Sequence, residues 1–163
     1  MEPREHREQT VQDESRGFKK LIAWQRADEL ASAVFHSVEQ LPPQHRWLAP
    51  QISRAAVSVP ANMAEGYARG SLADYLRFLD ISRGSLSEVE YYIHFLAKEG
   101  LIAQADADRL KSLRSDTGFL LHRLWLSLKA KSTGAWDHKG TQNQIRETAT
   151  ELYEAAEPYE VEA

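Results

Sequence analysis

The stretch SVPANMAEG, Ser58 to Gly66, lies in the middle of a run whose apolar spacing is otherwise helical. Proline inside a helix removes one backbone hydrogen bond and crowds the preceding turn, which costs about 3 kcal/mol. An interior glycine costs about 1 kcal/mol relative to alanine. A helix that carries both Pro60 and Gly66 must therefore gain something from its surroundings.

The proline leaves one carbonyl of the preceding turn, that of Ala56, without its usual amide donor. The helix either kinks at Pro60 or begins again there with Ser58 as its cap. Because a freed carbonyl needs another partner, the side chain of Asn62 or a neighbouring helix is the candidate donor.

The same run carries polar side chains on one line, which we call the polar seam: Gln51, Arg54, Ser58, Asn62, Glu65 and Arg69. The next helical run contains ISRGSLSE, residues 81–88, whose two serines and a glycine also reduce local bulk. Two helices thinned at mid-length could pack closely, and Arg77 or Arg83 could then reach Asn62 or Glu65. The alternative is that these charges form an ordinary solvated face.

Apolar residues recur at three- and four-residue spacing in four segments, which predicts helices over residues 21–41, 46–69, 72–99 and 103–131. Gly70 and Gly100 are stop signals, and Ser71 has the chemistry of a helix N-cap. Short connections make successive helices antiparallel. The expected fold is therefore all-α, an up-down-up-down four-helix bundle over residues 18–131.

Charge divides the 163-residue chain into three parts. Residues 1–17 carry a net charge of −2, residues 18–134 carry 15 basic and 12 acidic side chains, and residues 135–163 carry −5. We expect a disordered N-terminal tail over 1–17 and an acidic, largely flexible extension over 132–163, in which a weak apolar stripe favours a short helix at 141–157. The mildly basic central part permits a polyanionic partner without requiring one.

The chain contains no cysteine, which excludes a disulfide framework and thiolate chemistry. Its N-terminus alternates charge and has no apolar h-region, so we expect a cytoplasmic protein with no membrane anchor.

The C-terminal part of the fourth predicted helix is apolar around most of its circumference. A helix of a monomeric bundle needs only one apolar face, so the surplus predicts a subunit interface at Phe119, Trp125 and Leu126. The alternative is that the tails of the same chain cover this surface.

Catalytic patterns are missing from the sequence. None of the histidines in the expected bundle follows a glutamate at the spacing of a di-iron site, there is no HExxH, and the Gly66 to Ser71 segment lacks the lysine of a phosphate-binding loop. His94 lies four residues after Glu90 and could pair with it. We therefore expect no metal, no cofactor and no enzymatic activity.

Two blocks of sequence carry a resemblance. The first is Arg54-Ala55, Ser58, Pro60, Asn62 and Ala64-Glu65-Gly66. The second is Arg77-Phe78-Leu79 followed by Arg83-Gly84-Ser85-Leu86 and Glu88. Together they resemble the four-helix bundle proteins also called 23S rRNA intervening sequence proteins, over about residues 18–128.

The resemblance implies a cytosolic bacterial bundle that assembles into a ring, usually of five subunits. A similar protein of diversity-generating retroelements binds nucleic acid and a reverse transcriptase. We therefore expect a homo-oligomer that binds RNA or DNA, or a reverse transcriptase or other nucleic-acid enzyme, through Arg54, Arg69, Arg77 and Arg83. The alternative is a purely structural or protein-interaction scaffold, in which these arginines and Glu65 fasten helices or subunits together.

Overall fold

The computed structural model describes residues 17–132, so the expectations for residues 1–16 and 133–163 lie outside the described residues. Within the described part, the chain forms four long helices: α2 (Ile22–Glu39), α3 (Ala49–Ala68), α4 (Leu72–Lys98) and α5 (Gln104–Lys131). Two short 3-10 helices precede α2 and α3: η1 (Gly17–Lys20) and η2 (Pro43–Leu48).

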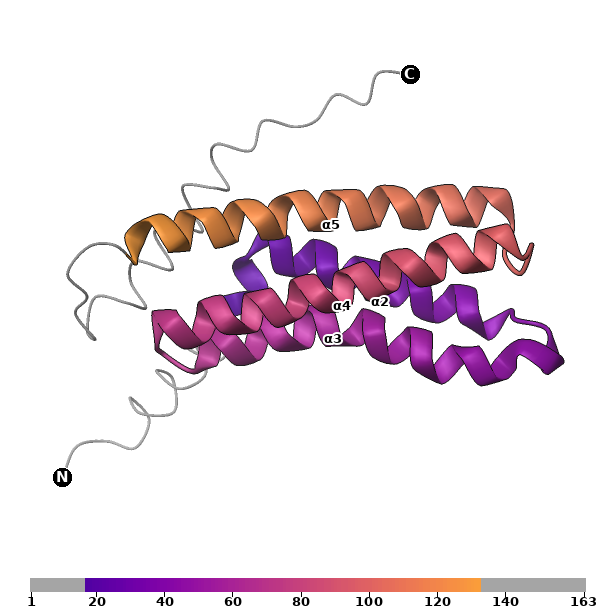
Figure 1. Ribbon diagram of the computed structural model, residues 1–163, viewed down its shortest axis with the longest axis horizontal. Helices are drawn as coiled ribbons and strands as arrows, with labels where there is room; N and C mark the ends of the chain where they lie inside the picture. Colours follow the sequence, from indigo (N-terminus) through magenta and orange to yellow (C-terminus); the bar gives the residue numbers. More distant parts are fainter. Residues whose placement is uncertain (1–16, 133–163) are drawn as a thin grey trace, which may run out of the picture.

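Successive helices run in opposite directions along one long axis (Figure 1). Each helix packs against two neighbours, in the pairs α2 with α3, α3 with α4, α4 with α5 and α5 with α2. The predicted antiparallel four-helix bundle is therefore confirmed. A ring of such bundles remains a prediction, because one chain is described.

The cap and stop residues predicted from the sequence lie at helix ends in the structure. The hydroxyl of Ser71 accepts a hydrogen bond from the backbone amide of Asp74 at 3.4 Å and caps α4. Gly70 and Gly100, which follow α3 and α4, have φ angles of +68° and +65°. Only glycine adopts this left-handed conformation at little cost, which explains the two sharp reversals.

Two boundaries differ from the prediction. The second long helix begins at Ala49 rather than near Arg46, and the residues before it form η2. Pro50 gives the reason, because proline lacks an amide hydrogen and suits the first turn of an α-helix. The first helix ends at Glu39, although Leu41 beyond it is still buried.

The core lies between the four helices, and the predicted apolar faces line it. Seven residues of α4 that recur at three- and four-residue spacing are buried: Tyr75, Leu79, Ser82, Leu86, Val89, Ile93 and Leu96. The apolar stripe of α3 is buried as well, at Ile52, Ala56, Val59, Met63 and Tyr67.

Gly66 lies at a close contact between α3 and α4. A Cβ atom at this position would lie 2.6 Å from the Cβ of Phe78 and 2.9 Å from Cδ2 of Tyr75. Both distances are shorter than a van der Waals contact, so the absence of a side chain is what allows the two helices to meet. Gly84 on α4 differs, because a Cβ there would meet no atom within 4 Å.

We predict that Gly66→Ala lowers the free energy of unfolding by about 1–3 kcal/mol, because the added methyl group overpacks this contact. Gly84→Ala is the matched control, since it should raise stability by about 0.5–1 kcal/mol through helix propensity alone. Urea unfolding followed by circular dichroism measures both. Equal effects of the two substitutions would contradict the close approach.

Tyr75 is fully buried beneath this contact, with its ring perpendicular to that of Tyr67 at 6.0 Å between centroids. Its hydroxyl has no hydrogen-bond partner within the described residues. Burial, and secondarily the neighbouring Tyr67, raises the pKa of this hydroxyl far above its usual range. The unfolded chain therefore loses this proton at a lower pH than the folded chain does.

We predict that stability declines above about pH 10, the ordinary tyrosine pKa, because ionisation of Tyr75 then favours unfolding. Tyr75→Phe should flatten this alkaline decline and raise stability by about 1 kcal/mol at pH 7, since it removes an unsatisfied buried hydroxyl. Thermal unfolding between pH 7 and 11 measures both effects, with Tyr91→Phe, at an exposed tyrosine, as control. A loss of stability in Tyr75→Phe at pH 7 would mean that the hydroxyl is satisfied.

Candidate nucleic-acid interface

The turn around Pro60 receives side-chain donors from both neighbouring helices. The hydroxyl of Ser82 on α4 donates to the carbonyl of Val59 at 3.0 Å, and Nε1 of Trp24 on α2 donates to the carbonyl of Pro60 at 3.1 Å. α3 continues through the proline without a new start. Neighbouring helices thus supply donors to the carbonyls of Val59 and Pro60, while a partner for the carbonyl of Ala56 stays a prediction.

The side chain of Asn62 binds a carbonyl two residues beyond the one that was expected, which is that of Ala56. Its side-chain amide donates to the carbonyl of Ser58 at 2.7 Å and to the hydroxyl of the same residue at 2.9 Å. The expectation that Asn62 serves the carbonyl of Ala56 is therefore wrong. The reason is helical spacing, because residues four apart lie one above the other on a helix face.

The close packing predicted for the two thinned segments is confirmed. The hydroxyls of Ser58 and Ser85 lie 2.9 Å apart across the α3–α4 boundary, and Ser82 reaches the α3 backbone. Gly84 does not contribute to this packing, since space around it is open. The serines rather than the glycine make this part of the contact.

The predicted pairing of Arg77 or Arg83 with Asn62 or Glu65 is wrong. Instead, each arginine pairs with a carboxylate on its own helix: Arg69 with Glu65, Arg77 with Asp74 at 3.8 Å and Arg83 with Asp80 at 3.2 Å. A carboxylate three or four residues away is always in reach, whereas a partner on another helix requires a favourable register. The solvated face, the alternative interpretation, describes these side chains better.

Arg54 forms no ion pair within residues 17–132. It lines a cavity of about 240 Å³ between α3 and α4, together with Ser58, Ser85, Glu88 and Tyr92. Burial raises the pKa of Tyr92, and Glu88 raises it further, while the charge of Arg54 acts in the opposite direction. Arg54 is thus the candidate cation with the fewest local partners.

The four candidate arginines lie on two faces rather than one. The guanidinium groups of Arg69 and Arg77 both lie against the ring of Phe78, at 5.3 Å and 4.6 Å from its centroid. Arg83 instead lies over the ring of Trp125 on α5, at 5.3 Å. Arg54, Arg69 and Arg77 therefore belong to the α3–α4 side, and Arg83 belongs to the α4–α5 side.

The three predicted interface residues differ in exposure. Phe119 and Leu126 are 44% and 48% exposed. Trp125 is half-buried against the core, with His122 stacked on it and Lys129 5.9 Å from its centroid. The prediction of a subunit interface thus stays open for Phe119 and Leu126, while much of Trp125 is covered within the chain.

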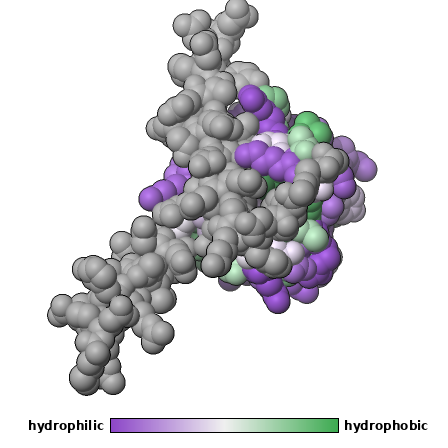
Figure 2. All heavy atoms as spheres, turned by 90° about the vertical axis from the view of Figure 1, so that its left-hand side faces the viewer, coloured by the Kyte–Doolittle hydropathy of each residue, from purple (hydrophilic) through white to green (hydrophobic). Residues whose placement is uncertain are grey.

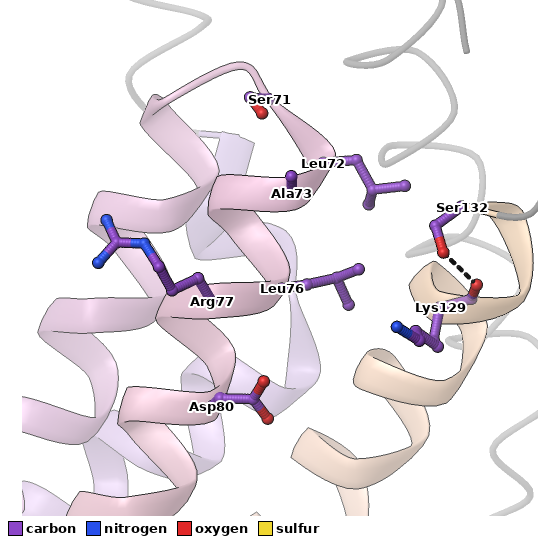
Figure 3. Close-up of a pocket in the computed structure, with 8 residues that line it drawn as sticks. All are labelled: Ser71, Leu72, Ala73, Leu76, Arg77, Asp80, Lys129 and Ser132. Atoms are coloured by element: carbon purple, nitrogen blue, oxygen red, sulfur yellow. Dashed lines mark hydrogen bonds between the residues drawn. The ribbon is translucent and has the colours of Figure 1, made fainter.

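A cavity of about 540 Å³ lies between the start of α4 and the end of α5. Figure 3 shows Leu72 and Leu76 pointing across it toward Lys129 of α5, whereas Arg77 points away. This end of the bundle faces the viewer in Figure 2, where hydrophilic side chains surround smaller apolar areas. The lining of this cavity contains the positive charge of Lys129 and the negative charge of Asp80, so it favours no single class of ligand.

One ion pair between helices is not predicted from the sequence. Nη2 of Arg114 on α5 lies 2.6 Å from Oε2 of Glu90 on α4, so the pairing of Glu90 with His94 that its spacing allowed is replaced by a contact with α5. Helical periodicity places residues on faces but does not give the register between helices. For that reason no signal in the sequence identified this pair.

Residues 17–132 offer neither a metal site nor a membrane-spanning helix. No group of three or more histidine, cysteine or carboxylate side chains could hold a metal ion. In the same part of the chain, no helix combines the length and apolar character that crossing a membrane requires.

The fold and the candidate surface define a class of protein: an antiparallel four-helix bundle with a proline-bearing helix locked by side-chain hydrogen bonds and with arginines on its outer faces. The family model for the 23S rRNA-intervening sequence protein matches residues 19–123. The chain belongs to that family. No curated protein sequence matches it.

We predict that Ser82→Ala lowers the free energy of unfolding by about 1 kcal/mol, because it removes the hydrogen bond to Val59 beside the proline. Ser87→Ala is the control, since its exposed hydroxyl donates only to the carbonyl of Arg83 on the same helix. Chemical denaturation of both variants provides the comparison. The proposed support of the proline turn fails if Ser82→Ala is as stable as Ser87→Ala.

Proposed function

We propose that the protein is a non-enzymatic homo-oligomeric bundle that binds RNA or DNA, or a nucleic-acid-processing partner such as a reverse transcriptase, through exposed arginines. Five copies is the number that the family resemblance implies. The single observation that carries the proposal is the state of Arg69, Arg77 and Arg83, whose side chains are 53%, 61% and 44% exposed and paired only within their own helices.

Such pairs are weak and easily exchanged for another anion. An exposed ion pair contributes about 0–1 kcal/mol, and salt screens it further. A phosphate can therefore replace the carboxylate at small cost, and the planar guanidinium matches its oxygens. The net charge of +3 for residues 18–134 adds up across the copies of an oligomer, which strengthens attraction for a polyanion.

Two exposed apolar side chains support self-association. Phe119 and Leu126 are exposed and lie two turns apart on α5, and the guanidinium of Arg123 lies 5.7 Å from the centroid of the Phe119 ring. An apolar area with a basic rim is suited to a contact between proteins.

A second candidate function is a structural or protein-interaction scaffold without nucleic-acid binding. One observation favours it: Ser58, Asn62 and Gly66, which cost helix stability, are all engaged in contacts within the chain. Glu65 likewise pairs with Arg69 on the same helix. This candidate predicts that Arg54→Ala or Glu65→Ala disturbs assembly or thermal stability.

We predict that fluorescently labelled single-stranded RNA or DNA binds the protein at low salt and is released as salt rises. The log–log slope should be about −0.7 for each phosphate contact. Arg69→Gln/Arg77→Gln should weaken binding and reduce this slope. Arg26→Gln is a matched control, because Arg26 also forms an exposed pair three residues apart, with Glu29 on α2. Fluorescence anisotropy at several salt concentrations measures all three.

Light scattering of the same samples distinguishes the two candidates. An intact oligomer that loses only nucleic-acid binding supports the first function, whereas an arginine variant that dissociates supports the scaffold. Leu126→Glu should dissociate the oligomer, and Val57→Glu, at an exposed position on α3, should not. If the unmodified protein binds neither RNA nor DNA at low salt, nucleic-acid binding is excluded.

A further inference from the structure

A second basic surface lies between α4 and α5, away from the α3–α4 side. It surrounds a cavity of about 300 Å³ lined by Glu90, Ile93 and His94 of α4 and by Lys111, Arg114 and Ser115 of α5. The polar part of this lining thus consists of three side chains that carry nitrogen atoms, one hydroxyl and one carboxylate. This volume is at the small end of the range for ligand sites and exceeds what a single phosphoryl group requires.

Arg114 differs from the other ion-paired arginines. Its side chain is 28% exposed, against 44–61% for Arg26, Arg69, Arg77 and Arg83. Within residues 17–132, its ion pair with Glu90 is the one that joins two helices. A charge that is partly withdrawn from water interacts more strongly with a ligand than a fully solvated one does.

The guanidinium group of Arg114 is held in place by Glu90, but not all of its N–H groups have a hydrogen-bond acceptor. Nη2 binds Glu90, and a Cβ on Gly118 would lie 3.7 Å from Nη1, so the group rests over that glycine. Nε is buried and has no hydrogen-bond partner in the described part of the chain. Arg114 also lines the cavity and keeps 28% of its side chain exposed, so its guanidinium group can meet an anionic oxygen there.

The remaining charges permit an anion to enter. Asp108 lies 3.8 Å from Lys111, at an exposed pair on the same helix, and does not line the cavity. Glu90 is the carboxylate in the lining, and Arg114 already neutralises it. The pair of Lys111 with Asp108 is exposed and therefore weak, so Lys111 can exchange that carboxylate for a ligand, with His94 and the hydroxyl of Ser115 as further donors.

From this arrangement we propose that the α4–α5 cavity binds a phosphoryl group, held by Arg114, Lys111 and His94 with Ser115. A terminal phosphate, which carries two charges and three free oxygens, suits several converging donors better than an internal phosphodiester does. The site stands apart from the proposed arginine surface and does not depend on nucleic-acid binding.

Titration of the full chain with inorganic phosphate, in a buffer free of phosphate and sulfate, tests the site. Isothermal calorimetry should detect saturable binding of one phosphate per chain. Lys111→Gln and His94→Gln should each weaken it by about tenfold, and Arg114→Gln should abolish it. Arg109→Gln is the matched control, because Arg109 is an exposed cation of α5 that does not line the cavity.

Because Arg114→Gln leaves Glu90 unpaired and could disturb folding, the exposed Lys111 decides the outcome. No binding of phosphate to the unmodified protein would overturn the proposal. Equal binding to Lys111→Gln and Arg109→Gln would overturn it as well.

A second arm identifies the source of the phosphoryl group. A 5′-phosphorylated oligonucleotide and its 5′-hydroxyl counterpart are compared, and adenosine 5′-monophosphate is compared with adenosine. A preference for the phosphorylated strand that Lys111→Gln removes assigns the site to a nucleic-acid end. A preference confined to the mononucleotide assigns it to a small metabolite. If no oligonucleotide binds, the proposed function fails, while the phosphate titration still decides this site.

Discussion

The bundle depends on how its third helix passes a proline without breaking. Ser82 and Trp24 donate to two successive carbonyls around Pro60, and Asn62 binds the turn before it. These donors come from α4, α2 and α3 itself, so one turn of one helix fixes three of the four helices relative to one another. The bonds from Ser82 and Trp24 are tertiary contacts that stabilise the turn carrying the proline, and they form only when the helices meet in this register.

The polar side chains of α3 fall into two groups, those that bind other parts of the bundle and those that face solvent. Those near mid-length bind other parts of the bundle, and those toward the ends and the outer face remain in solvent. Arg69 after α3, and Arg77 and Arg83 on α4, pair with carboxylates of the helix that carries them or that they follow. These exposed ion pairs join no two helices, so a partner's anion can replace the carboxylates. The ion pair of Arg114 with Glu90 differs from these pairs, because it joins two helices and the Arg114 side chain is partly buried.

Periodicity and capping signals predict most of the fold. Ser71, Gly70 and Gly100 mark their boundaries correctly because each acts through its own backbone conformation. Apolar spacing alone places the start of the second helix near Arg46, whereas Pro50 marks its true start at Ala49. The candidate site was harder to predict. Which arginine meets which carboxylate, and that Gly66 rather than Gly84 faces another helix, depends on register and rotation, which a spacing pattern leaves open.

The tryptophans of the described residues occupy three contrasting environments. The indole of Trp24 is bonded to the proline turn, that of Trp47 is 62% exposed, and that of Trp125 lies beside Arg83 and Lys129. Because indole emission shifts with polarity and is quenched by nearby charged groups, the three report on different places. The chain thus carries intrinsic optical reporters: one for the docking of α2 on α3, one for the η2 loop and one for the α4–α5 face.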